Sequence, residues 1–186
     1  MSNEDKSLKT SFQVLTVVMT LLVFGGAIWV AKEQMGERIR EQVLAQYAQE
    51  LYAISLVHQV TMLESAEVVF LDDPSDQLVV YGEVADLSGA LGVRLFTMDG
   101  EFLISSPENI ADGSVPTIHM ESIAEFIPAS RLSGALPINE VFWEPLLETG
   151  FVGQKTLTVR DVLLPVHVAD EDELLGVVQF LFDASD

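Results

Sequence analysis

The longest feature of the hydrophobic pattern is an apolar run near the start of the chain. No charged residue occurs between Thr10 and Ala31, and the core of the run, FQVLTVVMTLLVFGGAIWVA, covers residues 12–31. A helix of that length rises about 30 Å, which matches the hydrocarbon core of a bilayer. Trp29 near its end is typical of an interfacial anchor. The pattern predicts a transmembrane helix at 12–31 behind a short cytoplasmic tail at 1–11.

A cleaved signal peptide is the alternative interpretation of this run, because Gly25 and Ala27 fit a small-x-small cleavage site. The apolar run continues beyond that site, however, and the segment before it is not clearly basic, so we expect an uncut anchor. Lys and Arg are about equally frequent on its two sides, and the positive-inside rule does not orient it. The short polar tail ahead of a large domain with few cations favours export. We therefore expect a single-pass protein of the cell inner membrane with a periplasmic C-terminal domain.

A helical stripe follows the apolar run. Its apolar positions step by four and then three residues: Met35, Ile39, Val43, Tyr47, Leu51, Ile54 and Val57. This spacing predicts one long stalk helix over 32–66. From about residue 51 the sequence becomes mostly apolar, so we expect the distal half of the helix to be buried in the domain. The proximal half is either a plain spacer or a pairing surface, for a homodimer or for another membrane protein.

A pattern of short strands around turns begins near residue 93. The stretch VRLFTMDGEFLISSP contains an Asp-Gly pair at 99–100 between two mixed apolar runs. Asp-Gly is typical of a two-residue hairpin turn, which needs positive φ at both central positions. This register places Phe96 opposite Leu103 and Arg94 opposite Ser105. Both faces are largely apolar, so we expect the hairpin to be covered on both sides.

Two apolar, β-branched segments predict a closing hairpin at the end of the chain. They are TLTVRDVLLPVHV at 156–168 and LLGVVQFLFD at 174–183. With the stalk helix and the first hairpin, they make the fold class α+β. Residues 67–186 are predicted to form an antiparallel sheet with flanking helices behind the transmembrane and stalk helices.

Helix signals lie between the two hairpins and before the first. The segment LDDPSD offers Ser75 or Asp76 as the N-cap of a helix that leads to the first hairpin, although Leu78, Val80 and Val84 also fit a strand pattern. The segment MESIAEFIPA predicts a short helix that stops near Pro128. Residues 130–154 contain several glycines and prolines, and we expect them to be irregular.

The charge of the chain is very uneven. Residues 42–186 hold 4 basic and 24 acidic side chains, which accounts for the whole net charge of −20. Phosphate repels such a surface, so the composition excludes a nucleic-acid partner. The chain has no cysteine, no glycine-rich phosphate loop, no H-E-x-x-H and no G-x-S-x-G motif. We expect neither an enzyme nor a protein that carries a metal or another cofactor.

The order of the predicted elements, with the phrases VRLFTMDGEFL and LPVHV…LLGVVQF, resembles a single Cache domain. Such domains are the PAS-like extracytoplasmic sensor domains of bacterial membrane receptors. The resemblance covers residues 35–183 and implies a five-stranded antiparallel sheet with a small-molecule pocket between the sheet and its covering loops. In these receptors a second membrane helix and a transmitter usually follow the last strand. Here the sequence stops at Asp186, so we expect the module to act through a partner protein.

The candidate ligand-binding residues are three polar side chains and two aromatic ones: Arg94, Arg131, His167, Tyr81 and Trp143. A guanidinium on an apolar strand face, as at Arg94, should meet a carboxylate, either internal or from a ligand. Arg131 lies in the region that the resemblance implies as a lid. Core packing is the alternative role of His167 and of both aromatic residues.

Two functions therefore stay open. The first is a membrane-anchored extracytoplasmic module that binds a small molecule, held in lipid through residues 12–31. The second is a structural accessory subunit of a larger membrane complex, with a Cache-like domain that binds no ligand. A buried, charged pocket favours the first function. A filled interior with an exposed apolar face favours the second.

Overall fold

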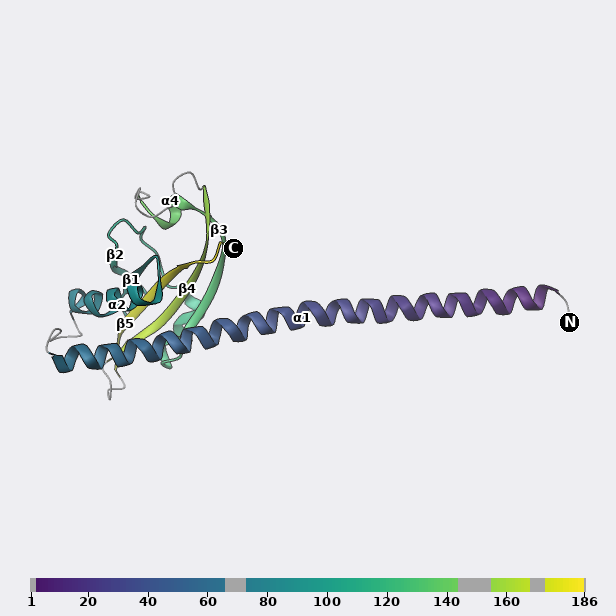
Figure 1. The fold of residues 1–186 in the computed structure, drawn as a ribbon, viewed down its shortest axis with the longest axis horizontal. Coiled ribbons are helices and arrows are strands. Elements are labelled where there is room, and N and C mark those ends of the chain that lie inside the picture. Colours follow the sequence, from purple (N-terminus) through teal and green to yellow (C-terminus); the bar gives the residue numbers. More distant parts are fainter. Residues whose placement is uncertain (1–2, 66–72, 144–154, 168–172, 186) are drawn as a thin grey trace. The chain divides into compact units, whose positions relative to one another are not determined.

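The computed structural model describes residues 3–65, 73–143, 155–167 and 173–185, without the side chains of residues 3–18, 37, 63 and 65. The chain divides into two compact parts, residues 1–43 and residues 44–186. The elements appear in Figure 1 and occur in this order: α1 (Asn3–Ser65), α2 (Pro74–Ser88), β1 (Gly92–Phe96), β2 (Phe102–Ser106), α3 (Thr117–Ala124), β3 (Ala129–Pro137), α4 (Ile138–Val141), β4 (Thr156–His167) and β5 (Leu174–Asp183).

The first part of the chain belongs to helix α1. Within it, Met35, Ile39 and Val43 are exposed, as a pairing surface requires. Among the residues with described side chains, no helix has a stretch long and apolar enough to cross a membrane. The first residues of the predicted span, 12–18, lie outside that set.

The second part of α1 packs on the domain through a stripe that the sequence pattern placed correctly at Tyr47 and Leu51 and wrongly beyond them. The buried side chains are Ala48, Leu51, Ser55, Gln59 and Met62. Ile54 and Val57 belong to the predicted stripe, but they lie on the exposed side of the helix. Ser55 is accommodated because its hydroxyl donates to the Leu51 carbonyl oxygen at 2.8 Å. The amide of Gln59 donates to the His167 carbonyl oxygen at 2.8 Å. The buried stripe thus includes polar residues outside the predicted apolar positions, and hydrogen bonds satisfy them.

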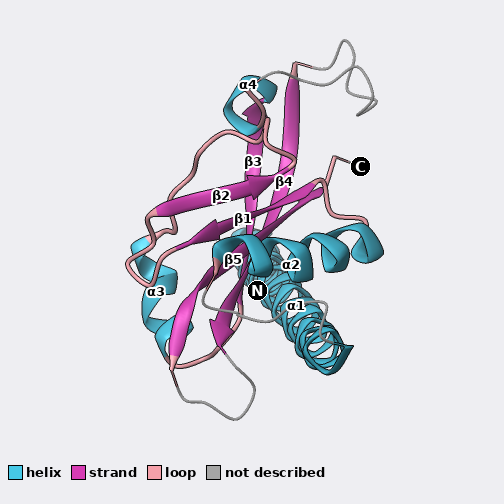
Figure 2. Cartoon of the chain, turned by 90° about the vertical axis from the view of Figure 1, so that its left-hand side faces the viewer, coloured by secondary structure: helices cyan, strands magenta, loops and turns pink. Residues whose placement is uncertain are grey.

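The sheet has five strands in the order β2-β1-β5-β4-β3, and all neighbours are antiparallel (Figure 2). This confirms the predicted five-stranded antiparallel sheet and the closing hairpin. Arg94 pairs with Ser105 as expected, but Phe96 pairs with Phe102 across a bulge. The strand β2 lies at the sheet edge, and its Leu103 is 41% exposed, so the hairpin is not covered on both sides.

The tip of the first hairpin explains the shifted register. The Thr97 amide donates to the Glu101 carbonyl oxygen at 2.8 Å, and the Gly100 amide donates to the Thr97 carbonyl oxygen at 3.0 Å. Gly100 has φ of +79°, whereas Asp99 is not among the residues with positive φ. The loop therefore has three residues with glycine in the left-handed position, and not the predicted two-residue turn. The extra residue moves the strand partner of Phe96 by one position.

Two predictions for the connecting segments were also wrong. The N-cap of α2 is Asp73, whose side chain accepts from the Ser75 amide at 2.8 Å, and Pro74 starts the helix. The segment 130–154 was expected to be irregular, but β3 and α4 occupy residues 129–141. The rest of that segment, 144–154, lies outside the described residues. The edge strand β3 tolerates its glycine and proline because one side of its backbone needs no partner.

The two faces of the sheet have different covers. Helix α2 and the part of α1 from residue 44 onward cover one face, which buries Val93, Leu95, Val162, Leu164, Val178 and Phe180. The other face packs against α3, α4 and the segment 107–116, through two smaller clusters around Phe96 and Leu181. The candidate site lies on this second face, between the two clusters.

Candidate functional site

Three polar side chains interrupt the apolar second face of the sheet. Arg94 on β1 lies opposite Gln179 on β5, and Asp161 on β4 lies opposite Arg131 on the edge strand β3. Arg94, Gln179 and Asp161 are 8%, 3% and 4% exposed. Their neighbours along each strand on the same face are apolar, because side chains two apart in a strand share a face. The strand register therefore gathers these polar groups at one place.

A cavity of about 190 Å³ opens over these residues. Side chains of four strands form its floor, and the segment 112–114 and helix α4 form its walls. The lining residues are Arg94, Asp112, Gly113, Ser114, Arg131, Leu136, Glu140, Val141, Val159, Asp161, Gln179 and Leu181. Since a water molecule takes about 30 Å³ of liquid volume, the cavity holds on the order of six non-hydrogen atoms. It fits a small metabolite.

The guanidinium of Arg94 is buried without a close counter-ion. One of its terminal nitrogens donates to Gln179 Oε1 at 3.1 Å. Its Nε has no hydrogen-bond partner, and none of the ion pairs found in the described part of the chain involves this side chain. Burial lowers the pKa of Arg94 from its ordinary value, and the carboxylates of Asp161 and Asp112 counteract part of that effect. A buried cation in this state offers hydrogen bonds to an incoming anion.

The carboxylate of Asp161 is, in contrast, already engaged. Its Oδ2 accepts from the Arg131 guanidinium at 2.7 and 3.2 Å, and from the Ser133 hydroxyl at 3.1 Å. Asp161 is buried, whereas the Arg131 side chain is 46% exposed. The pair therefore closes one side of the cavity, with its arginine at the rim.

The pKa of His119 on α3 depends on the same charged groups, Arg131 and Asp161. Burial lowers the pKa of its imidazole from the ordinary value, Arg131 lowers it further, and Asp161 acts in the opposite direction. The neutral imidazole is favoured in this environment because both main effects penalise its charged form.

Two of the five sequence-predicted residues meet in this cavity. Arg94 and Arg131 both line it, although Arg131 lies on strand β3 and not in a lid loop. The guanidinium of Arg131 forms an internal ion pair, whereas the guanidinium of Arg94 forms none in the described part of the chain. For Arg94, contact with a ligand stays a prediction.

The other three predicted residues lie elsewhere. The imidazole of His167 accepts or donates a short hydrogen bond with the Tyr52 hydroxyl and lies 5.0 Å from the Phe126 ring. Tyr81 is buried on the opposite face of the sheet, 6.3 Å from the ring of Phe180. Trp143 is 62% exposed and is not among the residues that line the cavity. In each case the structure favours a packing or surface role over contact with this cavity.

The sequence did not identify Asp161, Gln179, Asp112 and Gly113 as residues of the site. Asp161 and Gln179 each have apolar residues two positions away on both sides of their strand, and that interruption of an apolar face was the available signal. Asp112 and Gly113 lie in a loop whose path no pattern predicts. Strand register, which only the structure gives, was needed to bring them together.

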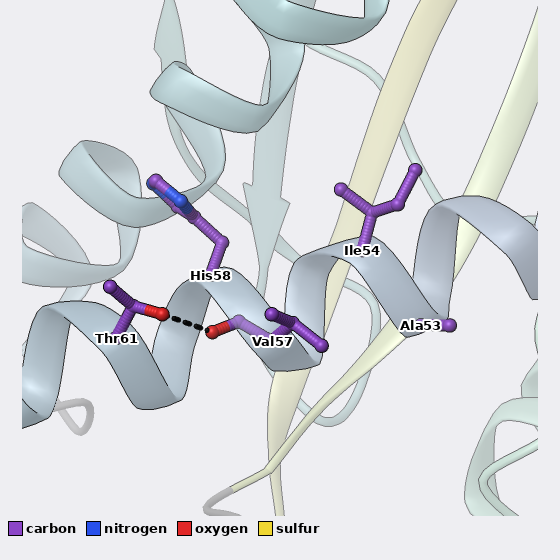
Figure 3. A pocket seen from close by; sticks show the side chains of 5 residues that line it. All are labelled: Ala53, Ile54, Val57, His58 and Thr61. Atoms are coloured by element: carbon purple, nitrogen blue, oxygen red, sulfur yellow. Dashed lines mark hydrogen bonds between the residues drawn. The ribbon is translucent and has the colours of Figure 1, made fainter.

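A second hollow, of about 360 Å³, lies on one side of α1 and is lined by Ala53, Ile54, Val57, His58 and Thr61 (Figure 3). It is open and mostly apolar. Its one imidazole already faces α2, where His58 Nε2 lies 3.0 Å from Glu83 Oε2. The hydroxyl of Thr61 donates to the Val57 carbonyl oxygen at 2.9 Å. This surface has the character of a packing face and not of a small-molecule site.

No protein-family model and no curated protein matches the chain. Among solved structures it is similar to the ligand-binding domain of the chemoreceptor Tlp3 of Campylobacter jejuni, in complex with 4-methylisoleucine. The identity is 10%, the TM-score is 0.36, and the match covers 77% of this chain and 57% of that one. It is also similar to the ligand-binding domain of the amino acid chemoreceptor PctC of Pseudomonas aeruginosa PAO1, in complex with GABA. There the identity is 15%, the TM-score is 0.33, and the coverage is 82% and 61%.

This chain thus spans less than two thirds of either chemoreceptor domain. Both solved structures are ligand-binding domains of bacterial chemoreceptors, the class of protein that the sequence resemblance names. At TM-scores below 0.5, neither ligand is carried over to the cavity described above.

Proposed function

We propose that residues 44–186 form a sensor module that binds a small molecule with a carboxylate or a similar anionic group. The observation that carries this proposal is the buried guanidinium of Arg94, which lines a cavity and forms no ion pair within 4 Å in the described part of the chain. A charged group taken out of water without a partner costs free energy. An anionic ligand offsets that cost through charge-assisted hydrogen bonds, so we expect it to bind more tightly than a neutral ligand of the same shape.

The size of the cavity narrows the class of ligand. About 190 Å³ admits a carboxylate with a few further atoms and is too small to enclose a whole nucleotide or oligosaccharide. The rim carries Asp112 and Glu140, so a dianionic ligand that extends to the rim is disfavoured. We therefore propose a short monocarboxylate-like group as the part of the ligand that enters.

A calorimetric series tests this function. The purified full-length chain is titrated with formate, acetate, propionate and butyrate, and with acetamide and propionamide as neutral controls of matched shape. The two ligands of the similar chemoreceptors, 4-methylisoleucine and GABA, complete the panel. We expect saturable binding of a carboxylate and none of its amide. Equal behaviour of acid and amide, or no binding across the panel, contradicts the proposal.

We further propose that the module is tethered to the inner membrane through residues 12–31 and acts through a partner. The uncharged run in the sequence supports the tether, and the exposed apolar residues Met35, Ile39 and Val43 support pairing along α1. Protease added to spheroplasts should digest residues 44–186 if the domain is exported. Protection of those residues contradicts this placement.

An accessory subunit without a ligand is the second candidate function. The observation in its favour is the open apolar hollow on α1, where Ile54 and Val57 are 44% and 68% exposed. The charged cavity favours the sensor function, because a domain that has lost its ligand has no need to keep a buried arginine without a counter-ion. The calorimetric series separates the two functions.

A further inference from the structure

We infer that Gly113 determines the ligand-binding geometry of Arg94, and this inference rests on the function proposed above. Gly113 belongs to the segment between β2 and α3, and it lines the same cavity. Its backbone lies directly against the guanidinium. A Cβ atom at this position would lie 2.9 Å from a terminal nitrogen of Arg94 and 3.3 Å from its Cζ.

The requirement for glycine here concerns space. Gly113 is not among the glycines with positive φ, so an alanine fits its backbone conformation. The atom that an alanine methyl would meet most closely is the far end of a flexible side chain. The chain can therefore fold around the methyl group if the guanidinium moves by a few tenths of an ångström. Gly113→Ala thus acts on the position of Arg94 and not on the backbone.

That small movement affects the hydrogen bond that orients the guanidinium. The bond from Arg94 to Gln179 Oε1 is 3.1 Å long, close to the upper limit of ordinary N–H···O bonds. Gln179 is buried on the central strand β5 and has little room to follow. A displaced guanidinium presents its terminal N–H groups at a different angle to the ligand. We expect the loss of one charge-assisted hydrogen bond to weaken carboxylate binding about 10- to 100-fold.

Four forms of the full-length chain test the inference, with propionate as the probe in calorimetry. They are the unchanged chain, Gly113→Ala, Arg94→Lys and the double variant. Gly134→Ala is the matched control, because a Cβ at Gly134 meets nothing within 4 Å. A lysine in place of Arg94 has no planar group at the position of the alanine methyl, so it removes the clash.

We expect Gly113→Ala to bind propionate more weakly than the unchanged chain, and Gly134→Ala to bind it equally well. The double variant should bind propionate within about twofold of Arg94→Lys alone. If Gly113→Ala binds as well as the unchanged chain, the inference fails while the proposed function stands. If its effect is as large in the Arg94→Lys background, Gly113 acts through something other than the guanidinium, and the inference also fails.

Two further outcomes are also decisive. If Gly113→Ala does not fold but the double variant with Arg94→Lys does, the contact between Gly113 and Arg94 is supported. If the double variant also does not fold, the inference is overturned. If the unchanged chain binds no carboxylate at all, the proposed function fails and the inference fails with it.

Discussion

Replacement of Arg94 by methionine should leave the stability of the ligand-free protein almost unchanged. Methionine keeps most of the buried stem volume, so the cavity cost is small. The variant loses one charged hydrogen bond to Gln179, at a cost of about 1.5–3 kcal/mol that includes the buried Gln179 Oε1 left without this donor. It also removes an unsatisfied buried donor and a desolvated charge, which cost about 1–3 kcal/mol in the folded state. The two effects have opposite signs and similar size, so we expect a change within about 1 kcal/mol.

Arg131→Met is the matched comparison, because it removes the same kind of side chain from the same cavity. Here Asp161 stays buried and loses two of its hydrogen bonds. A fully buried pair costs about 3–5 kcal/mol when one partner is removed. The arginine of this pair is 46% exposed, and solvent screening reduces the effect to about 1–3 kcal/mol.

Urea denaturation of the ligand-free, full-length chain measures both changes. We expect the Arg131→Met midpoint to fall clearly and the Arg94→Met midpoint to stay near that of the unchanged protein. In melting experiments a loss of 1 kcal/mol corresponds to about 2–4 °C for a domain of this size. A loss above about 3 kcal/mol for Arg94→Met would refute the reasoning, because such a cost is typical of a broken internal ion pair.

Three further predictions concern the turn, the pH dependence and the stalk. Gly100→Val places a β-branched residue at φ of +79° and should lower the free energy of unfolding by about 1–3 kcal/mol in urea denaturation. Gly82→Ala in α2, where a Cβ meets nothing within 4 Å, should raise the free energy of unfolding slightly. Equal effects of the two substitutions would contradict the prediction. Burial lowers the pKa of His119, so between that lowered pKa and about 6.5 the unfolded chain binds more protons than the folded chain. The free energy of unfolding should therefore fall as the pH drops through this range. The His119→Gln variant should lose this pH dependence. Ile39→Glu with Val43→Glu should weaken self-association or docking of the detergent-solubilised chain, and an unchanged size in cross-linking and light scattering would make the stalk a spacer.

The sequence predicted four of the five strands because apolar, β-branched runs and turn signals are local features, but it missed β3 at Ala129–Pro137. Both hairpins appear where the apolar runs are, and the pairing of Arg94 with Ser105 was correct. The prediction failed at Phe96 because the choice between a two- and a three-residue loop depends on backbone geometry that Asp-Gly does not determine alone. It failed on α1 because Ser55 and Gln59 are buried with hydrogen bonds, which a hydrophobic stripe does not reveal.

The candidate site was predicted only in part, for a different reason. Arg94 was identifiable as a charge on an apolar strand face, but its neighbours depend on the order of strands in the sheet. Strand β5 lies between β1 and β4, and this brings Gln179 and Asp161 to an arginine far away in sequence. His167 has a similar sequence context but does not line this cavity, because it lies at the end of β4 beside Tyr52.

The most direct test of the central claim observes the Nε–H group of Arg94 by ¹⁵N nuclear magnetic resonance while propionate is added. This group is buried and has no acceptor in the described structure, so a carboxylate that binds the terminal nitrogens of the same guanidinium should change its environment. The account predicts a saturable shift of that signal with propionate and no shift with propionamide, and the signal is assigned by its absence in Arg94→Lys. A signal that stays unchanged with propionate, or moves equally with the amide, would contradict the claim that this arginine binds the ligand.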